Sequence, residues 1–127
     1  MLFRTLLALS TLIAGQALAK SRGQVINCSG EKVKLCVFNG KDSSRVYPKE
    51  VYILKDGEYA NISCKGQGKR RCKVNFIDPR DSNDDCGYLF TDIYKVNKEE
   101  ILALTKYKRH DNTNAEKISS VTCNGLD

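Results

Sequence analysis

The sequence predicts an all-β fold, a small disulfide-stabilised antiparallel β-sandwich of about six strands. Short runs rich in β-branched and aromatic residues alternate with clusters of Gly, Asn, Asp and Pro, which is the pattern of short strands joined by turns. The chain also holds six cysteines, and an even number in a small exported protein is typical of a disulfide framework. The third observation is an export signal at the start of the chain.

Residues 1–19 have the features of a secretory signal peptide. They carry Arg4, an apolar run from about Leu6 to Ala14, and small residues at Ala17 and Ala19 of an A-x-A cleavage site. No later segment reaches the ~20 apolar residues that a membrane span needs. We therefore expect a secreted protein without a membrane span, in which residues 20–127 form a single domain and a monomer. Removal of Arg4 lowers the formal net charge from +6 to +5.

The strands are predicted from runs of β-branched and aromatic residues between turn residues. In chain order we expect them at Val33–Asn39, Glu50–Lys55, Glu58–Cys64, Arg71–Ile77, Tyr88–Val96 and within Lys117–Cys123. Asn97 with Glu100 three residues later is a helix-capping pattern, so residues 98–106 form either one short helix or a further strand. Residues 106–117, "KYKRHDNTNAEK", are predicted to be a flexible loop.

The segment "CKGQGKRRC" is predicted to form the tip of a cross-linked hairpin. If Cys64 faces Cys72 across an antiparallel pair, Ile62 faces Val74 and Ala60 faces Phe76, so that one face is apolar. The other face is mostly polar, with Ser63 opposite Lys73 and Asn61 opposite Asn75. Because opposed residues have neighbouring Cβ atoms, this register predicts a Cys64–Cys72 disulfide.

Five basic residues lie at this end of the predicted hairpin: Lys65, Lys69, Arg70, Arg71 and Lys73. Such a cluster attracts anionic surfaces, although charged residues of this kind also protect strand edges without binding anything. A phosphate-binding loop is excluded, because the glycine spacing fits no nucleotide motif and a strand follows. Nucleic-acid binding is not expected, because only Tyr59 offers an aromatic ring near the cluster.

The sequence predicts no catalytic residue, no cofactor and no metal. Zinc is not expected, because there is no C-x2-C pair and His110 is the single histidine. Asp81, Asn83 and Asp85 resemble the start of a calcium loop, but Cys86 stands where that loop requires glycine. A secreted ribonuclease-type enzyme is the alternative, with His110 and either Glu58 or Glu99 as the acid–base pair.

Asn27-Cys28-Ser29 and Asn61-Ile62-Ser63 both fit the N-glycosylation sequon. They matter only in a chain that passes through a eukaryotic secretory pathway.

Two segments, "KLCVFNGKDSSRVYPKEVYILKDGEYANISCKG" and "DCGYLFTDIYKVN", resemble the MAX effectors, small secreted β-sandwich virulence proteins of plant-pathogenic fungi. The resemblance rests on Cys36-Val37-Phe38 in a first strand, on the glycine turn Lys55-Asp56-Gly57 and on Cys86 just before the fifth strand. It spans about Lys34 to Asn97. Six cysteines exceed the single pair of the family, and the chain after Lys98 is longer than the family pattern.

The resemblance implies two packed three-stranded antiparallel sheets that are tied by Cys36–Cys86, with Cys28–Cys123 joining the termini. The alternative set is Cys28–Cys86 with Cys36–Cys123. Members of the family often enter host cells and bind small host domains by pairing an exposed strand edge with the sheet of the partner. The candidate edges here are 46–54 and 58–63.

We therefore expect a secreted binding protein that engages a host protein through a strand edge and a cationic surface. The candidate partner-binding residues are the five basic residues above together with Val51, Ile53, Tyr59 and Asn61. Two alternatives remain open at this point, a small cationic ribonuclease-like enzyme or toxin and a module that binds acidic glycans.

Overall fold

The computed structural model describes residues 23–39, 50–63, 71–80, 86, 93–108 and 111–126. These residues form eight strands and no helix. In chain order the strands are β1 (Gly23–Asn27), β2 (Val33–Asn39), β3 (Glu50–Leu54), β4 (Tyr59–Ile62), β5 (Arg71–Ile77), β6 (Tyr94–Asn97), β7 (Ile101–Lys108) and β8 (Asp111–Ile118). The prediction of an all-β, disulfide-linked sandwich is confirmed.

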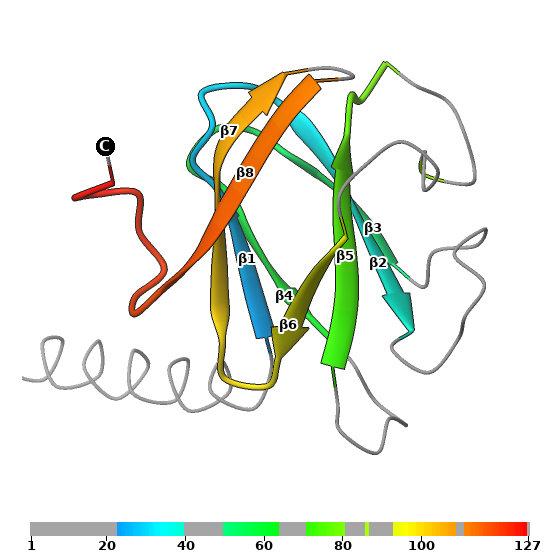
Figure 1. The fold of residues 1–127 in the computed structure, drawn as a ribbon, viewed down its shortest axis with the longest axis vertical. Helices are drawn as coiled ribbons and strands as arrows, with labels where there is room; N and C mark the ends of the chain where they lie inside the picture. The colour runs from blue at the N-terminus through cyan, green and yellow to red at the C-terminus, as the bar shows by residue number, and fades with distance from the viewer. Residues whose placement is uncertain are drawn as a thin grey trace, which may run out of the picture.

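The eight strands form two sheets that lie as two layers (Figure 1). Sheet A has the order β4-β1-β7-β8, and sheet B has the order β3-β2-β5-β6. Each sheet therefore has four strands, and the expectation of three per sheet is wrong. The pairing is antiparallel except between β1 and β7, which are parallel.

The main hydrophobic core fills the space between the two sheets. Alternate residues of every strand from β1 to β7 reach this core, as the period-2 geometry of a strand requires. Its largest members are Phe76, Leu35, Ile62, Leu102 and Leu104. Gly23 lies where the two layers come close together: a Cβ atom there would lie 2.9 Å from Val96 Cγ1 of the other sheet.

The predicted hairpin between residues 58 and 77 is wrong. β4 pairs with β1 in sheet A, whereas β5 pairs with β2 and β6 in sheet B. Ile62 and Val74 are both fully buried in the core, but they reach it from opposite layers. The period-2 pattern identified the buried face of each strand correctly, but two strands in opposite sheets give the same pattern as two paired strands.

Sheet B is also covered on its outer face. A second buried cluster lies there and consists of Cys36, Phe38, Ile77 and Cys86. Asn75, which was expected on a polar outer face, is fully buried and donates a hydrogen bond from Nδ2 to the Cys86 carbonyl oxygen at 2.7 Å. Residue 86 therefore turns part of the predicted outer face into a second core.

The helix alternative for residues 98–106 is also wrong, because these residues form a turn and β7. Asn97 N–H donates to the Glu100 carboxylate at 2.7 Å, and Glu100 N–H donates to the Asn97 carbonyl oxygen at 3.1 Å. The first of these bonds is one that a capping box would make, but the second uses the Asn97 backbone carbonyl in place of its side chain, as a turn does. Here they close the turn by which the chain passes from sheet B to sheet A.

Two further expectations near the C-terminus fail. Most of the predicted flexible loop at 106–117 belongs to β7 and β8, which pair as an antiparallel ladder. The strand expected within Lys117–Cys123 ends at Ile118, and the chain then leaves the sandwich without regular structure (Figure 1). β1 was not predicted at all. All five of its residues are buried, so it lacks the alternation that marks a half-exposed strand.

Several predicted features lie outside the described residues. They are the signal peptide at 1–19, the loop from Cys64 to Arg70, the acidic turn at Asp81–Asp85 and His110. Among the residues that are described, no helix is long and apolar enough to cross a membrane.

Candidate functional site: an exposed strand edge

The sandwich has two open sides, each formed by one edge strand from each sheet. β3 and β4 follow each other in the chain and contact each other at one side, and β6 and β8 form the other. An edge strand presents unpaired backbone groups that can accept a further strand, and natural proteins usually block such edges. The four edges differ in how they are blocked.

The β6–β8 side is closed by side chains that bridge the two sheets. The Tyr94 hydroxyl donates to the Thr113 carbonyl oxygen at 2.9 Å, and Lys117 Nζ donates to the Lys95 carbonyl oxygen at 2.7 Å. Lys117 also forms a salt bridge with Glu100 at 3.0 Å. Both acceptor carbonyls belong to edge strands, so these contacts occupy groups that an added strand would use.

We expect Tyr94→Phe to lower the free energy of unfolding by about 1 kcal/mol, since it deletes one hydrogen bond between the sheets but keeps the ring in the core. The ring packs against Phe76 with centroids 6.0 Å apart, and the substitution preserves that contact. Urea unfolding followed by circular dichroism measures the change. An unfolding midpoint equal to that of the wild type would show that the hydroxyl does not hold the two sheets together.

The edge of β4 is covered by side chains of β3. In the antiparallel ladder with β1, Ala60 and Ile62 direct their backbone groups at β1, so those of Tyr59 and Asn61 point outward. The Tyr52 hydroxyl lies 3.4 Å from the Asn61 carbonyl oxygen, and Ser63 N–H donates to the Glu50 carboxylate at 3.1 Å. The hydroxyl of Tyr52 also donates to that carboxylate. Part of this edge is therefore already used.

β3 is the edge that carries exposed apolar side chains. Val51 is 46% exposed and Ile53 is 50% exposed, and with Tyr59 they are the exposed large hydrophobic residues of the described chain. Both side chains point to the outer face of sheet B, because Val51 lies directly opposite Cys36 of the outer cluster. No charged residue interrupts β3 between Glu50 and Lys55, and the Glu50 carboxylate accepts from Ser63 and Tyr52. The exposed apolar part of β3 therefore contains no charged side chain.

The same outer face is basic. Lys34 lies directly opposite Ile53, and Lys73 lies directly opposite Lys95. The four described strands of sheet B place no acidic side chain on this face, since Glu50 is paired with Val37 of the core. The apolar pair at the edge is followed across the sheet by the outer cluster around Cys36, and the charged side chains that the described strands place on this face are basic. This favours an acidic partner over a basic one.

The structure divides the predicted partner-binding residues between two faces. Val51, Ile53 and Lys73 lie on the outer face of sheet B, whereas Tyr59 and Asn61 project from the outer face of sheet A. Lys65, Lys69 and Arg70 lie outside the described residues, and of Arg71 only the backbone, at the start of β5, is described. The basic surface therefore extends beyond the predicted hairpin, because Lys34 and Lys95 come from other strands.

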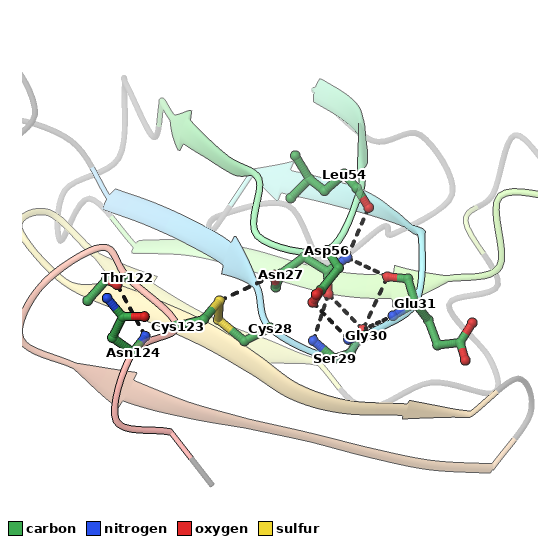
Figure 2. Close-up of a disulfide and its surroundings, with 10 residues drawn as sticks. All are labelled: Asn27, Cys28, Ser29, Gly30, Glu31, Leu54, Asp56, Thr122, Cys123 and Asn124. Atoms are coloured by element: carbon green, nitrogen blue, oxygen red, sulfur yellow. Dashed lines mark hydrogen bonds between the residues drawn. A yellow bond between two sulfur atoms is a disulfide. The ribbon is translucent and has the colours of Figure 1, made fainter.

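The turn that joins the two edge strands is held by Asn27, a fully buried residue that the sequence marked only as part of a sequon (Figure 2). Its Nδ2 donates to the Glu31 carbonyl oxygen at 2.6 Å and to the Leu54 carbonyl oxygen at 3.0 Å. Its Oδ1 accepts from Ser29 N–H at 3.0 Å and from the Ser29 hydroxyl at 2.7 Å. The end of β3 is therefore fixed to the end of β1.

The backbone of Asn27 completes this connection. Its N–H donates to the Glu58 carbonyl oxygen at 2.9 Å, and its carbonyl oxygen accepts from Gly57 N–H at 2.6 Å. Gly57 has a φ of 86°, which glycine adopts at little cost, and this agrees with the turn predicted at Lys55-Asp56-Gly57. A polar residue inside the apolar run "VINC" was the one signal in the sequence for this role.

Two disulfides flank the site. Cys28–Cys123 ties the end of β1 to the C-terminal segment, and Cys36–Cys86 fixes residue 86 to the outer face of sheet B. These are the pairs that the family resemblance implied, and the alternative pairing is wrong. Cys72 is also disulfide-bonded. Its predicted partner Cys64 lies outside the described residues.

The described residues form neither the alternative acid–base pair nor a metal site. Glu58 accepts a hydrogen bond from Lys55 N–H at 2.7 Å and closes the β3–β4 turn, and Glu99 lies in the β6–β7 turn with a φ of 71°. Their proposed partner His110 lies outside the described part of the chain. Within that part, no group of three or more His, Cys, Asp or Glu side chains is arranged to hold a metal ion.

The fold and the site define a disulfide-linked β-sandwich with one exposed apolar edge strand. Comparisons with protein families, with curated proteins and with solved structures gave no match to the chain.

Proposed function

We propose that this protein is a secreted binding protein that pairs the edge of β3 with an extended, acidic segment of a partner protein. In the setting that the sequence resemblance implies, it is a fungal virulence effector and the partner is a host plant protein. The single observation that carries the proposal is the exposure of Val51 and Ile53 on an edge strand, with no charged residue between them.

Strand addition suits this edge for a physical reason. Among the strands of the described residues, β3 pairs with β2 alone, so its far side can supply main-chain hydrogen bonds to an added strand. Val51 and Ile53 alternate along that strand and can select the side chains of the partner. Together they offer an apolar contact that is small but continuous with the buried cluster around Cys36.

The charge of the surrounding face supports an acidic partner. Lys34 on β2 lies directly opposite Ile53, and Lys73 and Lys95 lie farther across the same face on β5 and β6. The formal net charge of the whole chain is +6. Complementary charge accelerates encounter and disfavours basic competitors, and its effect falls with salt. Binding should therefore weaken as ionic strength rises, whereas the apolar contribution of Ile53 should not.

Ile53→Asp tests the proposal against a matched control, Tyr59→Asp. Ile53 and Tyr59 are both 50% exposed on edge strands, so both substitutions carry a similar risk to folding. Proteins captured from host plant extract by the immobilised wild type would be identified, and the dissociation constant of each purified candidate would then be measured. For the true partner we expect Ile53→Asp to weaken binding ~30-fold, the size of a central contact worth about 2 kcal/mol.

The expected pattern is a loss of binding with Ile53→Asp and nearly wild-type binding with Tyr59→Asp. Hydrogen exchange of the complex should also show added protection of the β3 amides. Equal weakening by both variants would contradict docking at β3. If neither substitution changes the binding, and an excess of a polyanion abolishes it, the result would instead favour acidic-glycan binding.

A further inference from the structure

The two N-glycosylation sequons lie in opposite structural environments. Asn27 and Asn61 are each followed by a serine two positions later, so the sequence alone gives them the same standing. The modification takes place on Nδ2 of the asparagine side chain. What that atom contacts in the folded protein therefore decides which sequon can carry a glycan without disrupting the fold.

Asn27 cannot carry a glycan in this fold. The residue is 0% exposed, and Nδ2 has two hydrogens, which it donates to the carbonyl oxygens of Glu31 and Leu54. A sugar on Nδ2 would replace one of these hydrogens and would need space at the junction of β1, β2 and β3 (Figure 2). A buried acceptor left without its donor costs about 1–3 kcal/mol even before the steric clash.

Asn61 meets the opposite conditions. Its side chain is exposed on the edge strand β4. Oδ1 accepts a hydrogen bond from Gln24 Nε2 at 2.8 Å, which fixes the amide plane. Among the contacts of the described residues, Nδ2 donates to no acceptor, so substitution there breaks no bond of the fold. Gln24 lies directly opposite Asn61 in the ladder, and together they hold the side chain on the outer face of sheet A.

We propose that Asn61 is an N-glycosylation site and that Asn27 is not occupied in the folded, secreted protein. In the transfer, Nδ2 of Asn61 forms a bond to the anomeric carbon of a lipid-diphosphate-linked oligosaccharide. The bond from that carbon to the diphosphate oxygen breaks, Nδ2 loses one proton, and the lipid diphosphate leaves. The oligosaccharide donor belongs to the eukaryotic secretory pathway that the export signal and sequons suggest.

A glycan at Asn61 would complete the protection of β4. The Glu50 and Tyr52 side chains already occupy part of this edge, and a bulky hydrophilic group beside Tyr59 would shield the remainder. The glycan would stand on the outer face of sheet A, whereas Val51 and Ile53 face outward from sheet B. On this side of the sandwich, β4 would then be blocked against an added strand, whereas β3 would remain open to one.

The test is secretion of the full chain from a yeast host, followed by peptide-N-glycosidase treatment and peptide mapping. We expect one glycan, released with conversion of Asn61 to aspartate. Asn61→Gln and Ser63→Ala should each remove it, and Ser63→Thr should keep it, because threonine preserves the sequon. Ser29→Ala, which deletes the other sequon and keeps the Asn27 amide, should leave the glycan pattern unchanged.

Three outcomes would overturn the inference. They are secreted wild-type protein without a glycan, a glycan mapped to Asn27, or a glycan that persists in Asn61→Gln. Comparison of treated and untreated wild-type protein separates this inference from the proposed function. A glycan mapped to Asn61, together with loss of partner binding by Ile53→Asp before and after the glycan is removed, would support both. A glycan at Asn61 without any β3-dependent partner would support the modification alone, and β3-dependent binding by a protein without a glycan would support the proposed function alone.

Discussion

Asn27→Ala is expected to lower the free energy of unfolding by about 3 kcal/mol. The substitution removes both Nδ2 donors and the Oδ1 acceptor of a fully buried side chain. The carbonyl oxygen of Leu54 then loses a partner in a buried position, where water cannot easily replace it. The loss should exceed that of an ordinary surface substitution because four groups, three in the turn after β1 and one at the end of β3, lose their partner at once.

Urea unfolding of the oxidised protein measures this change, and Asn61→Ala is the matched control. Asn61 makes its side-chain hydrogen bond to Gln24 at the surface, so its loss should change stability by no more than about 1 kcal/mol. Asn27→Asp should be nearly as damaging as Asn27→Ala, since it keeps the acceptor for Ser29 but supplies no donors. A stability loss below that of Asn61→Ala would contradict the role of Asn27 in fixing the β3–β4 turn.

Strand identity was predictable wherever one face of a strand is buried. β2 and β5 have the predicted bounds Val33–Asn39 and Arg71–Ile77, because apolar side chains recur in them between clear turn signals. β8 was missed for the opposite reason. Its sequence "DNTNAEKI" is polar because β8, which among the described strands pairs with β7 alone, needs few apolar contacts. A polar run of this kind predicts a loop.

Strand pairing was not predictable from the same pattern. Ile62 and Val74 both face the core, but the sequence does not say whether they face it from one sheet or from two. The strand that pairs with β4 is β1, which lies more than thirty positions earlier in the chain. Because all its residues are buried, β1 shows no alternation of apolar and polar residues. Asn75 shows a related limit, since its burial depends on Cys86 covering the outer face of sheet B.

The candidate site was partly predictable. Val51 and Ile53 were expected on a strand edge, and the structure places them there with exposed side chains. Tyr59 and Asn61 were grouped with them because β4 was also expected to be an edge, which it is. Their separation onto the other face follows from the change of sheet at Gly57. Predicting that change requires knowing which sheet each strand joins, and no local sequence pattern gives this information.

Removing the Cys36–Cys86 bridge with Cys36→Ala and Cys86→Ala together should lower the free energy of unfolding by about 3 kcal/mol. The bridge closes a separation of 50 residues, so its loss restores much conformational freedom to the unfolded chain. It also holds Cys86 over Phe38 and Ile77, which are buried on the outer face of sheet B. Loosening that cover would join these residues to exposed Val51 and Ile53 in one apolar surface.

That second effect separates this bridge from the other one. Cys28–Cys123 closes a separation of 95 residues, so the chain-entropy effects of the two bridges differ by only about 0.6 kcal/mol. Cys28→Ala with Cys123→Ala should therefore destabilise the fold to a similar degree, but it leaves the outer cluster of sheet B in place. Under native conditions, a dye that binds exposed apolar surface should fluoresce more with the Cys36/Cys86 variant than with the Cys28/Cys123 variant. Equal fluorescence from the two variants would mean that residue 86 stays on the sheet by packing alone, with the disulfide acting only on the unfolded chain.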